Sequence, residues 1–191
     1  MSGLLSVSYF LVTVLFGSLT FLLWARFGLQ YFKISSLHPM SKIIHRFTDP
    51  ILHPVARILQ IRVTRNQRYD WVCFGVLVVV EYIKFLIIGA LYFGHASVWS
   101  LTLAYTMADL IIQPCDLLFY ALVIRVIMSW VNPTWQHPLA SILYDITEPM
   151  LQRIRRRLPS TMGLDFSPFL MMIILKIITL FVNASLPFHM I

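Results

Sequence analysis

The chain reads RFGLQYFKISSLHPMSKIIHRFTDPILHPVAR at residues 26–57 and returns to the same pattern as RVIMSWVNPTWQHPLASILYDITEPMLQRIRR at residues 125–156, a constant offset of 99 residues. Each copy has an arginine, then a His-Pro step, then a Thr-Asp/Glu-Pro step, which is Thr48-Asp49-Pro50 in the first copy and Thr147-Glu148-Pro149 in the second. Matched prolines fix matched backbone breaks, so they predict repeated local architecture. We therefore expect two related halves, residues 1–94 and 95–191.

The offset between the halves shortens to 95 after residue 57, which aligns Asp70 with Asp165. It shortens because the basic stretch at residues 60–68 is four residues longer than its counterpart in the second half. The last apolar stretch of each half is therefore compared at an offset of 95.

The composition is that of a membrane protein. Hydrophobic residues make up 59% of the chain and charged residues 12%, against roughly 45–50% and about 25% in soluble domains. Residues 4–25 carry no charge, and at about 1.5 Å per residue they can cross a hydrocarbon layer of roughly 30 Å. A signal peptide is disfavoured because no Lys or Arg precedes this stretch and no A-x-A site follows it.

Three further apolar stretches predict spans at about residues 71–93, 103–124 and 166–187. Residues 96–131 are too long for one straight crossing, so part of this stretch should tilt or lie in the interface. Its Asp109, Gln113 and Pro114 mark either a kink or the outer end of the span. The predicted fold is an all-α membrane protein, with four transmembrane helices in two tandem two-span repeats.

Apart from Arg26 and Arg125 at the ends of the first and third spans, the positive charges outside the spans lie in the two long loops, residues 27–70 and 132–165. The N-terminus, the turn at residues 94–100 and the C-terminus contain no Lys or Arg. Because short positive loops stay on the cytoplasmic side, both loops should be cytoplasmic and both termini periplasmic. The two halves then have the same orientation, which predicts a pseudo-two-fold axis along the membrane normal.

Each loop is expected to contain a bent pair of helices. Apolar residues at i, i+3, i+4 and i+7 predict a short amphipathic helix in each loop; they are Met40, Ile43, Ile44 and Phe47, then Leu139, Ile142, Leu143 and Ile146. A proline disfavours helix at the preceding Asp49 or Glu148 and suits the start of a second helix, at residues 51–59 or 150–158.

The basic residues of the loops predict a surface for anionic lipid headgroups, with docking of a cytoplasmic protein as the alternative. The net charge is +7, and nucleic acid is disfavoured as a partner because no recognised binding motif accompanies the charge. The candidate basic patch comprises Arg57, Arg62, Arg65, Arg68, Arg153, Arg155, Arg156 and Arg157.

Four ionisable residues lie inside the predicted spans: Glu81, Lys84, Asp116 and Lys176. They are candidates for a charge network that either only holds the four helices together or forms a path for protons or ions. An ionised side chain at mid-bilayer costs roughly 2.5–3.5 kcal/mol, so each needs a partner or water. Glu81 corresponds to Lys176 at the offset of 95, and we expect these two to meet or to share a polar cavity. Alternatively, Lys84 satisfies Glu81 on the same helix and leaves Asp116 for Lys176.

Arg26 and Arg125 end the first and third spans, where snorkelling towards the headgroups is the ordinary expectation.

The order of these features resembles the YggT family, also called YlmG-like proteins. The resemblance covers nearly the whole chain and is closest in the second half, through Thr147-Glu148-Pro149, Arg155-Arg156-Arg157-Leu158-Pro159, Gly163, Asp165, Ser167 and Pro168. The first half departs from this pattern, because Gln60 stands in place of Pro159, and Val72 and Cys73 in place of Ser167 and Pro168. The resemblance implies a bacterial inner-membrane protein associated with envelope organisation, cell division, and osmotic or cation stress.

Catalysis has little support in the sequence. Cys73 and Cys115 lie in apolar segments without a C-x-x-C motif, and the loop histidines have no metal-ligand spacing. We therefore predict no cofactor and no metal, and a non-catalytic scaffold or assembly factor. The alternative is a small ion transporter or channel component that uses the four intramembrane charges, as an oligomer because four helices enclose little space.

Overall fold

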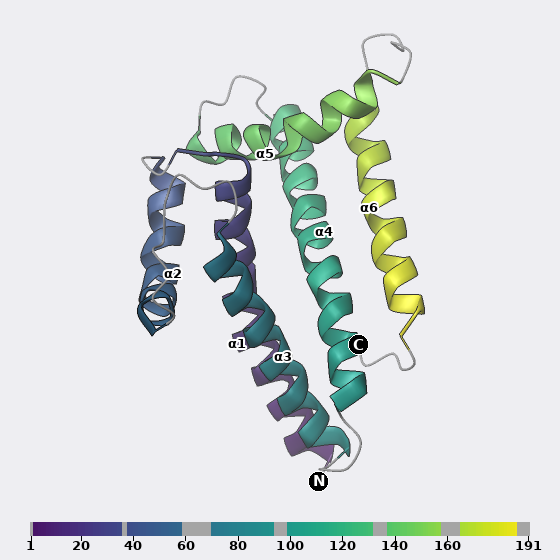
Figure 1. The fold of residues 1–191 in the computed structure, drawn as a ribbon. Helices are drawn as coiled ribbons and strands as arrows, with labels where there is room; N and C mark the ends of the chain where they lie inside the picture. The colour runs from purple at the N-terminus through teal and green to yellow at the C-terminus, as the bar shows by residue number, and fades with distance from the viewer. Residues whose placement is uncertain are drawn as a thin grey trace.

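A computed structural model describes residues 2–35, 38–58, 70–93, 99–131, 137–157 and 165–186 of the chain. These residues form α-helices and no strand, which confirms the all-α prediction. The helices are α1 (Ser2–Tyr31), α2 (Pro39–Ile58), α3 (Trp71–Phe93), α4 (Trp99–Val131), α5 (Pro138–Arg155) and α6 (Ser167–Ala184) (Figure 1). Four of them, α1, α3, α4 and α6, are long and apolar enough to cross a membrane.

The third predicted span lies within one continuous helix. α4 has 33 residues and contains Pro114 in its interior, so Asp109 and Gln113 lie inside the helix rather than at its outer end. At 1.5 Å per residue α4 is about 50 Å long, which exceeds the roughly 30 Å hydrocarbon layer and requires tilt or projecting ends.

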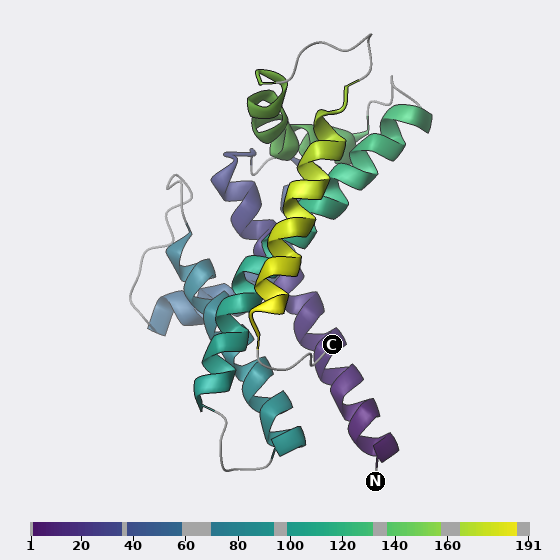
Figure 2. The same ribbon diagram turned by 90° about the vertical axis from the view of Figure 1, so that its right-hand side faces the viewer.

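The four long helices pack in a chain of neighbours. α1 packs along α3, α3 against α4, and α4 along α6, so α6 stands at one edge of the arrangement (Figure 1). The first turn of α1 and the last turns of α3 and α6 point towards the same side of the molecule, which is the lower side in Figures 1 and 2. α5 lies across the opposite ends of α4 and α6, and α2 lies beside α1 and α3 (Figure 1).

Each loop contains one helix where the sequence predicts a bent pair. α2 continues through Pro50 and Pro54, and α5 continues through Pro149. The predicted break is therefore wrong. A proline removes the bond that its own N–H would donate, and its ring crowds the carbonyl of the residue four positions earlier. Tertiary packing of the helix on both sides of the proline offsets these costs and keeps each helix continuous. We call α2 and α5 the loop helices.

The buried faces of the loop helices join the bundle. Leu52 and Ala56 of α2 pack with Leu23, Val72 and Leu77 in one cluster. Ile142 and Ile146 of α5 pack against Leu29 at the end of α1, and Leu151 packs with Leu122 and Leu175. α5 therefore contacts spans from both halves of the sequence.

Candidate functional site

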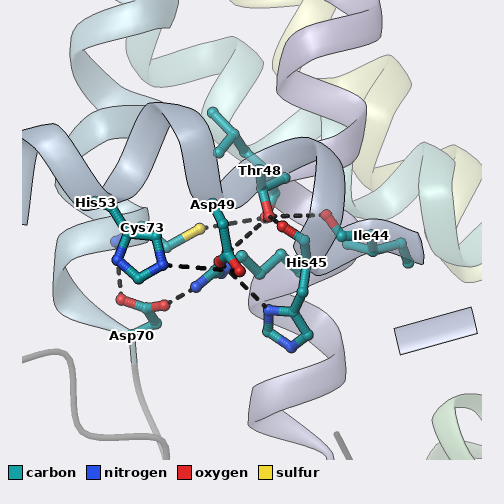
Figure 3. Close-up of polar contacts among 9 residues, drawn as sticks. Ile44, His45, Thr48, Asp49, His53, Asp70 and Cys73 are labelled. Atoms are coloured by element: carbon teal, nitrogen blue, oxygen red, sulfur yellow. Dashed lines mark hydrogen bonds and ion pairs between the residues drawn. The ribbon is translucent and has the colours of Figure 1, made fainter. Parts of the chain in front are cut away.

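Arg26 near the end of α1 holds the first loop helix from inside the protein. Its Nη1 atom donates to Thr48 Oγ1 at 2.7 Å and to Asp49 Oδ1 at 2.5 Å. The Thr48 hydroxyl in turn donates to the carbonyl oxygen of Ile44 at 2.8 Å, as Figure 3 shows. The Thr-Asp-Pro step thus gives Arg26 an acceptor hydroxyl and a carboxylate on adjacent residues of α2.

Asp70 joins this group from the start of α3. Its Oδ2 atom lies 3.5 Å from Arg26 Nε, and both side chains are 5% exposed. Its Oδ1 atom accepts a hydrogen bond from the backbone N–H of Cys73 at 3.0 Å, the contact expected of an N-cap aspartate. Arg26 therefore ties α2 to the entry of α3, and we call Arg26, Thr48, Asp49 and Asp70 the first arginine clamp.

The same contacts occur 99 residues later. Arg125 Nη1 donates to Thr147 Oγ1 at 2.6 Å, and Arg125 Nη2 donates to Glu148 Oε2 at 2.6 Å. The Arg125 guanidinium also lies over the ring of Tyr144, 4.1 Å from its centroid. Arg125, Thr147 and Glu148 form the second arginine clamp, which holds α5 to α4.

The clamps differ in how the following aspartate is neutralised. In the second half Arg155 bridges two acids, since its Nη1 donates to Glu148 Oε1 at 2.6 Å and its Nε donates to Asp165 Oδ2 at 2.8 Å. The position 99 residues before Arg155 is Ala56, which is buried and carries no charge. Asp70 therefore pairs with Arg26 itself, and the first clamp is the more deeply buried of the two.

Two carboxylates of the clamps, Asp49 and Glu148, are held ionised. A hydrogen bond from Arg125 lowers the pKa of Glu148, and the charge of Arg155 adds to this effect, while burial opposes it. Burial raises the pKa of Asp49, but the hydrogen bond and charge of Arg26, with His53 and His45 nearby, outweigh burial and leave that pKa lowered. The clamps are ion pairs near neutral pH.

The arginines of the clamps do not snorkel. Arg26 is 4% exposed and Arg125 is 7% exposed, so the expectation that they reach towards the headgroups is wrong. The acid on each loop helix pairs with the guanidinium inside the protein, and a paired, hydrogen-bonded charge can remain buried. The signal for this arrangement was present in the repeated Arg, Thr and Asp/Glu positions.

A second polar group lies between α3 and α4, and we call it the buried polar cluster. Lys84 Nζ is 2.5 Å from Glu81 Oε2 and also pairs with Asp109. Gln113 donates to Glu81 and, at 3.1 Å, to Asp109 Oδ2. The side chain of Glu81 is 0% exposed and that of Lys84 is 8% exposed, so two carboxylates share one ammonium group away from solvent.

The predicted meeting of Glu81 with Lys176 is not what the structure shows. Lys176 Nζ is instead 2.9 Å from Asp116 Oδ1, with side chains that are 43% and 34% exposed, and it lies over the ring of Phe119. The alternative arrangement, Glu81 with Lys84 and Asp116 with Lys176, is the one present. Asp109 and Gln113 are the partners that the sequence analysis missed, because it treated them as markers of a kink or a span end.

The basic patch is described only in part. Arg62, Arg65 and Arg68 lie outside the described residues. Arg153, Arg156 and Arg157 are exposed at the end of α5, and none of these three forms an ion pair with a described side chain, whereas Arg155 is occupied by Glu148 and Asp165. Arg57 is exposed in the last turn of α2.

The apolar stripe predicted for α2 is divided. Met40 and Ile44 pack against the cluster of Leu29, Ile142 and Ile146, whereas Ile43 and Phe47 face away from the bundle. Ile43 and Phe47 are 48% and 60% exposed. The face of α2 that is buried carries Ser41, Thr48, Leu52 and Ala56. The arginine clamp orients the helix through Thr48, and this orientation leaves Ile43 and Phe47 outside the buried face.

A family profile described as CCB3/YggT matches the chain over residues 5–91 and 104–186. The protein named YggT of Escherichia coli is 25% identical over 171 residues, which cover 90% of this chain and 86% of that protein. The protein PA0392 of Pseudomonas aeruginosa is 29% identical, covering 97% of this chain and 93% of the relative. A protein encoded in the proC 3' region of Vibrio alginolyticus is 32% identical, covering 86% of each chain. These relatives are named as uncharacterised proteins, and no solved structure matches the chain.

Proposed function

The chain belongs to the CCB3/YggT family, and on that premise we propose that it is a non-catalytic integral protein of the bacterial inner membrane. It acts as a scaffold or assembly factor in envelope organisation or cell division. The apolar lengths of α1, α3, α4 and α6 support the membrane location. The Lys and Arg residues of the two loops support an orientation with both loops cytoplasmic and both termini periplasmic.

The observation that carries this proposal is the pair of arginine clamps. Each clamp uses buried charge to fix a loop helix against the spans, at the cost of desolvating an arginine. The clamps leave Arg153 of α5, and Arg156 and Arg157 directly after it, outside this ion-pair system and exposed. A rigidly held helix that presents unpaired cations is suited to binding an acidic partner on the cytoplasmic side.

The partner class is an acidic surface of a cytoplasmic protein, with anionic lipid headgroups contributing at the rim of the same face. On α2, the exposed apolar residues Ile43 and Phe47 lie beside the exposed cations Lys42 and Arg46. This combination is suited to the membrane interface, where apolar side chains insert and cations meet headgroups.

The test is site-specific photocrosslinking in living cells. A photoreactive residue at Gln152, which is exposed on α5, should give a discrete protein adduct that weakens at least tenfold in the variant Arg153→Gln, Arg156→Gln, Arg157→Gln. The matched control is a photoreactive residue at Leu180 on α6, which is 66% exposed and apolar and should not give that adduct. Lipid adducts alone at Gln152, or the same protein adduct from both positions, would refute the scaffold.

The buried polar cluster favours a second candidate function, the transport of an ion. Two carboxylates around one ammonium group inside the membrane span are a group that can bind a proton or cation. Fluxes of K⁺, Na⁺ and H⁺ into liposomes with the purified protein test this candidate. Flux that is lost in a folded Glu81→Gln variant would favour transport, and equal flux in protein-free liposomes would rule it out.

A further inference from the structure

α6 occupies an open edge of the helix arrangement. α3 packs against α1, α2 and α4, whereas α6 packs against α4 and α5, the counterparts of α1 and α2. Residues at the offset of 95 show the difference. Glu81 and Leu77 of α3 are 0% exposed, but the corresponding Lys176 has a side chain 43% exposed, and the corresponding Met172 is half-buried. The second half lacks the neighbour that covers this face in the first half.

In the first half, α3 is covered by one face of α4. The corresponding face of α1 is exposed. In α4 the face towards α3 carries Asp109 and Gln113, which contact Lys84 and Glu81, and Tyr105, whose ring stacks on Phe85 at 5.7 Å. The residues 99 positions earlier lie on one stripe of α1 and are exposed; they are Ser6, Phe10 and Val14. The face of α4 that packs against α3 is therefore buried, whereas the corresponding face of α1 is exposed.

The ion pair between Asp116 and Lys176 adds a separate reason for a missing neighbour. Lys176 is at the middle of the 18 residues of α6, and Asp116 is at the middle of the candidate span Leu101–Val131. Both side chains are about one-third or more exposed. Charges at that depth are rarely left facing lipid, so a helix should cover this pair in the membrane.

We propose that two copies of this chain form a homodimer in which α6 of each copy packs against α1 of the other. The contact repeats between copies the arrangement that α3 and α4 have within one chain. A two-fold axis makes the two α6–α1 contacts identical, so the assembly closes and leaves neither edge open. A second copy of this chain is favoured over another protein because the required face is the repeat counterpart of one that the chain already buries.

The contacts within one chain set the register of the proposed interface. The stacked pair Phe85 and Tyr105 corresponds to Leu180 against Ser6 of the second copy. The contact of Glu81 with Gln113 corresponds to Lys176 against Val14, which would cover the ion pair of Lys176. Leu180 and Val14 are 66% and 52% exposed in the single chain, so both are available for this contact.

The test is crosslinking between two differently tagged copies, each with Cys73→Ala and Cys115→Ala. One copy carries Ser6→Cys, the other Leu180→Cys, and both are expressed together and treated in membranes with a short bis-maleimide. An adduct that carries both tags is expected. The matched control replaces Ser6→Cys by Leu4→Cys, which is 78% exposed, lies at the same depth and points to another side of α1; its adduct should be at least fivefold weaker.

Several results would overturn the dimer. They are the absence of a doubly tagged adduct from copies that elute as folded protein, equal adducts with the Leu4→Cys control, and crosslinking within a single chain that carries both Ser6→Cys and Leu180→Cys. The register has its own check, since Val14→Cys should crosslink with Lys176→Cys. Native mass spectrometry of the parent should give two chains of 22.2 kDa, and a trimer or larger species would refute closure at two copies.

Discussion

Removal of Lys84 should destabilise the protein more than any substitution of an exposed lysine. Among the residues that the structure describes, Lys84 is the one cation that contacts the two carboxylates of the buried polar cluster, Glu81 and Asp109. Removing one partner of a buried ion pair typically costs about 3–5 kcal/mol, because a charge is left uncompensated. Since Glu81 is fully buried and Asp109 is 18% exposed, we expect Lys84→Met to lower the free energy of unfolding by about 4 kcal/mol.

The triple variant Glu81→Gln, Lys84→Met, Asp109→Asn should recover most of this loss. Replacing a whole buried ion pair by neutral groups of similar volume is often close to neutral, so we expect a free energy of unfolding within about 1 kcal/mol of the parent. The control is Lys42→Met, an exposed lysine of α2, for which a change within about 0.5 kcal/mol is expected.

The assay is equilibrium unfolding in mixed micelles with increasing SDS, followed by tryptophan fluorescence and compared at equal protein concentration. The reasoning is refuted if Lys84→Met behaves like Lys42→Met. It is also refuted if the triple variant is as unstable as the single variant, because the loss would then come from packing rather than from uncompensated charge.

Three further outcomes follow from the clamps and the charge distribution. In the same assay Arg26→Met should lower the free energy of unfolding by about 3 kcal/mol, and Arg125→Met by about half of that. The first variant leaves Asp70 buried without its cation, whereas in the second Glu148 still pairs with Arg155. A larger loss for Arg125→Met would contradict this pairing. The pKa of Glu148 is lowered, so its stabilising contribution is complete above its ordinary pKa of 4.5 and is lost as pH falls through the lowered value; Glu148→Gln should flatten the fall in Tm as the pH drops below 4.5, and an unchanged slope would refute this. In cells, an impermeant maleimide should label Ser185→Cys directly and Gln152→Cys only after permeabilisation, and the opposite pattern would invert the proposed orientation.

The sequence was sufficient for the fold class because long apolar stretches are local signals. The matched prolines misled about the loop helices, each of which continues through its prolines. The sequence also allowed the pairing of Glu81 with Lys84, since residues three apart on a helix share a face. The contact of Lys84 with Asp109 joins residues 25 positions apart on different helices, and no local pattern reports such a distance. Asp109 was nevertheless a signal, because a carboxylate inside an apolar stretch requires a cation nearby.

The loop helices show why hydrophobic periodicity was misleading for part of the site. The pattern of Ile43 and Phe47 indicates a face, but it does not say whether that face meets protein or lipid. In α2 the Thr48 hydroxyl and the Asp49 carboxylate meet Arg26, and the position of the arginine decides which side turns inward. The repeated Arg, Thr and Asp/Glu positions carried that information, yet their contact appears only once α1 and α2 are placed side by side.

The partners of α4 have a consequence for how the protein is made. Asp109 is neutralised by Lys84 of α3, which is synthesised earlier, whereas Asp116 is neutralised by Lys176 of α6, which is synthesised later. α3 can leave the translocon with Glu81 and Lys84 already paired, and it then receives α4. Asp116 gains its partner only when Lys176, near the end of the chain, has been synthesised. The sequence halves are thus not the units of biogenesis, and a nascent chain truncated before residue 167 carries a carboxylate at mid-membrane, the kind of defect on which membrane quality control can act.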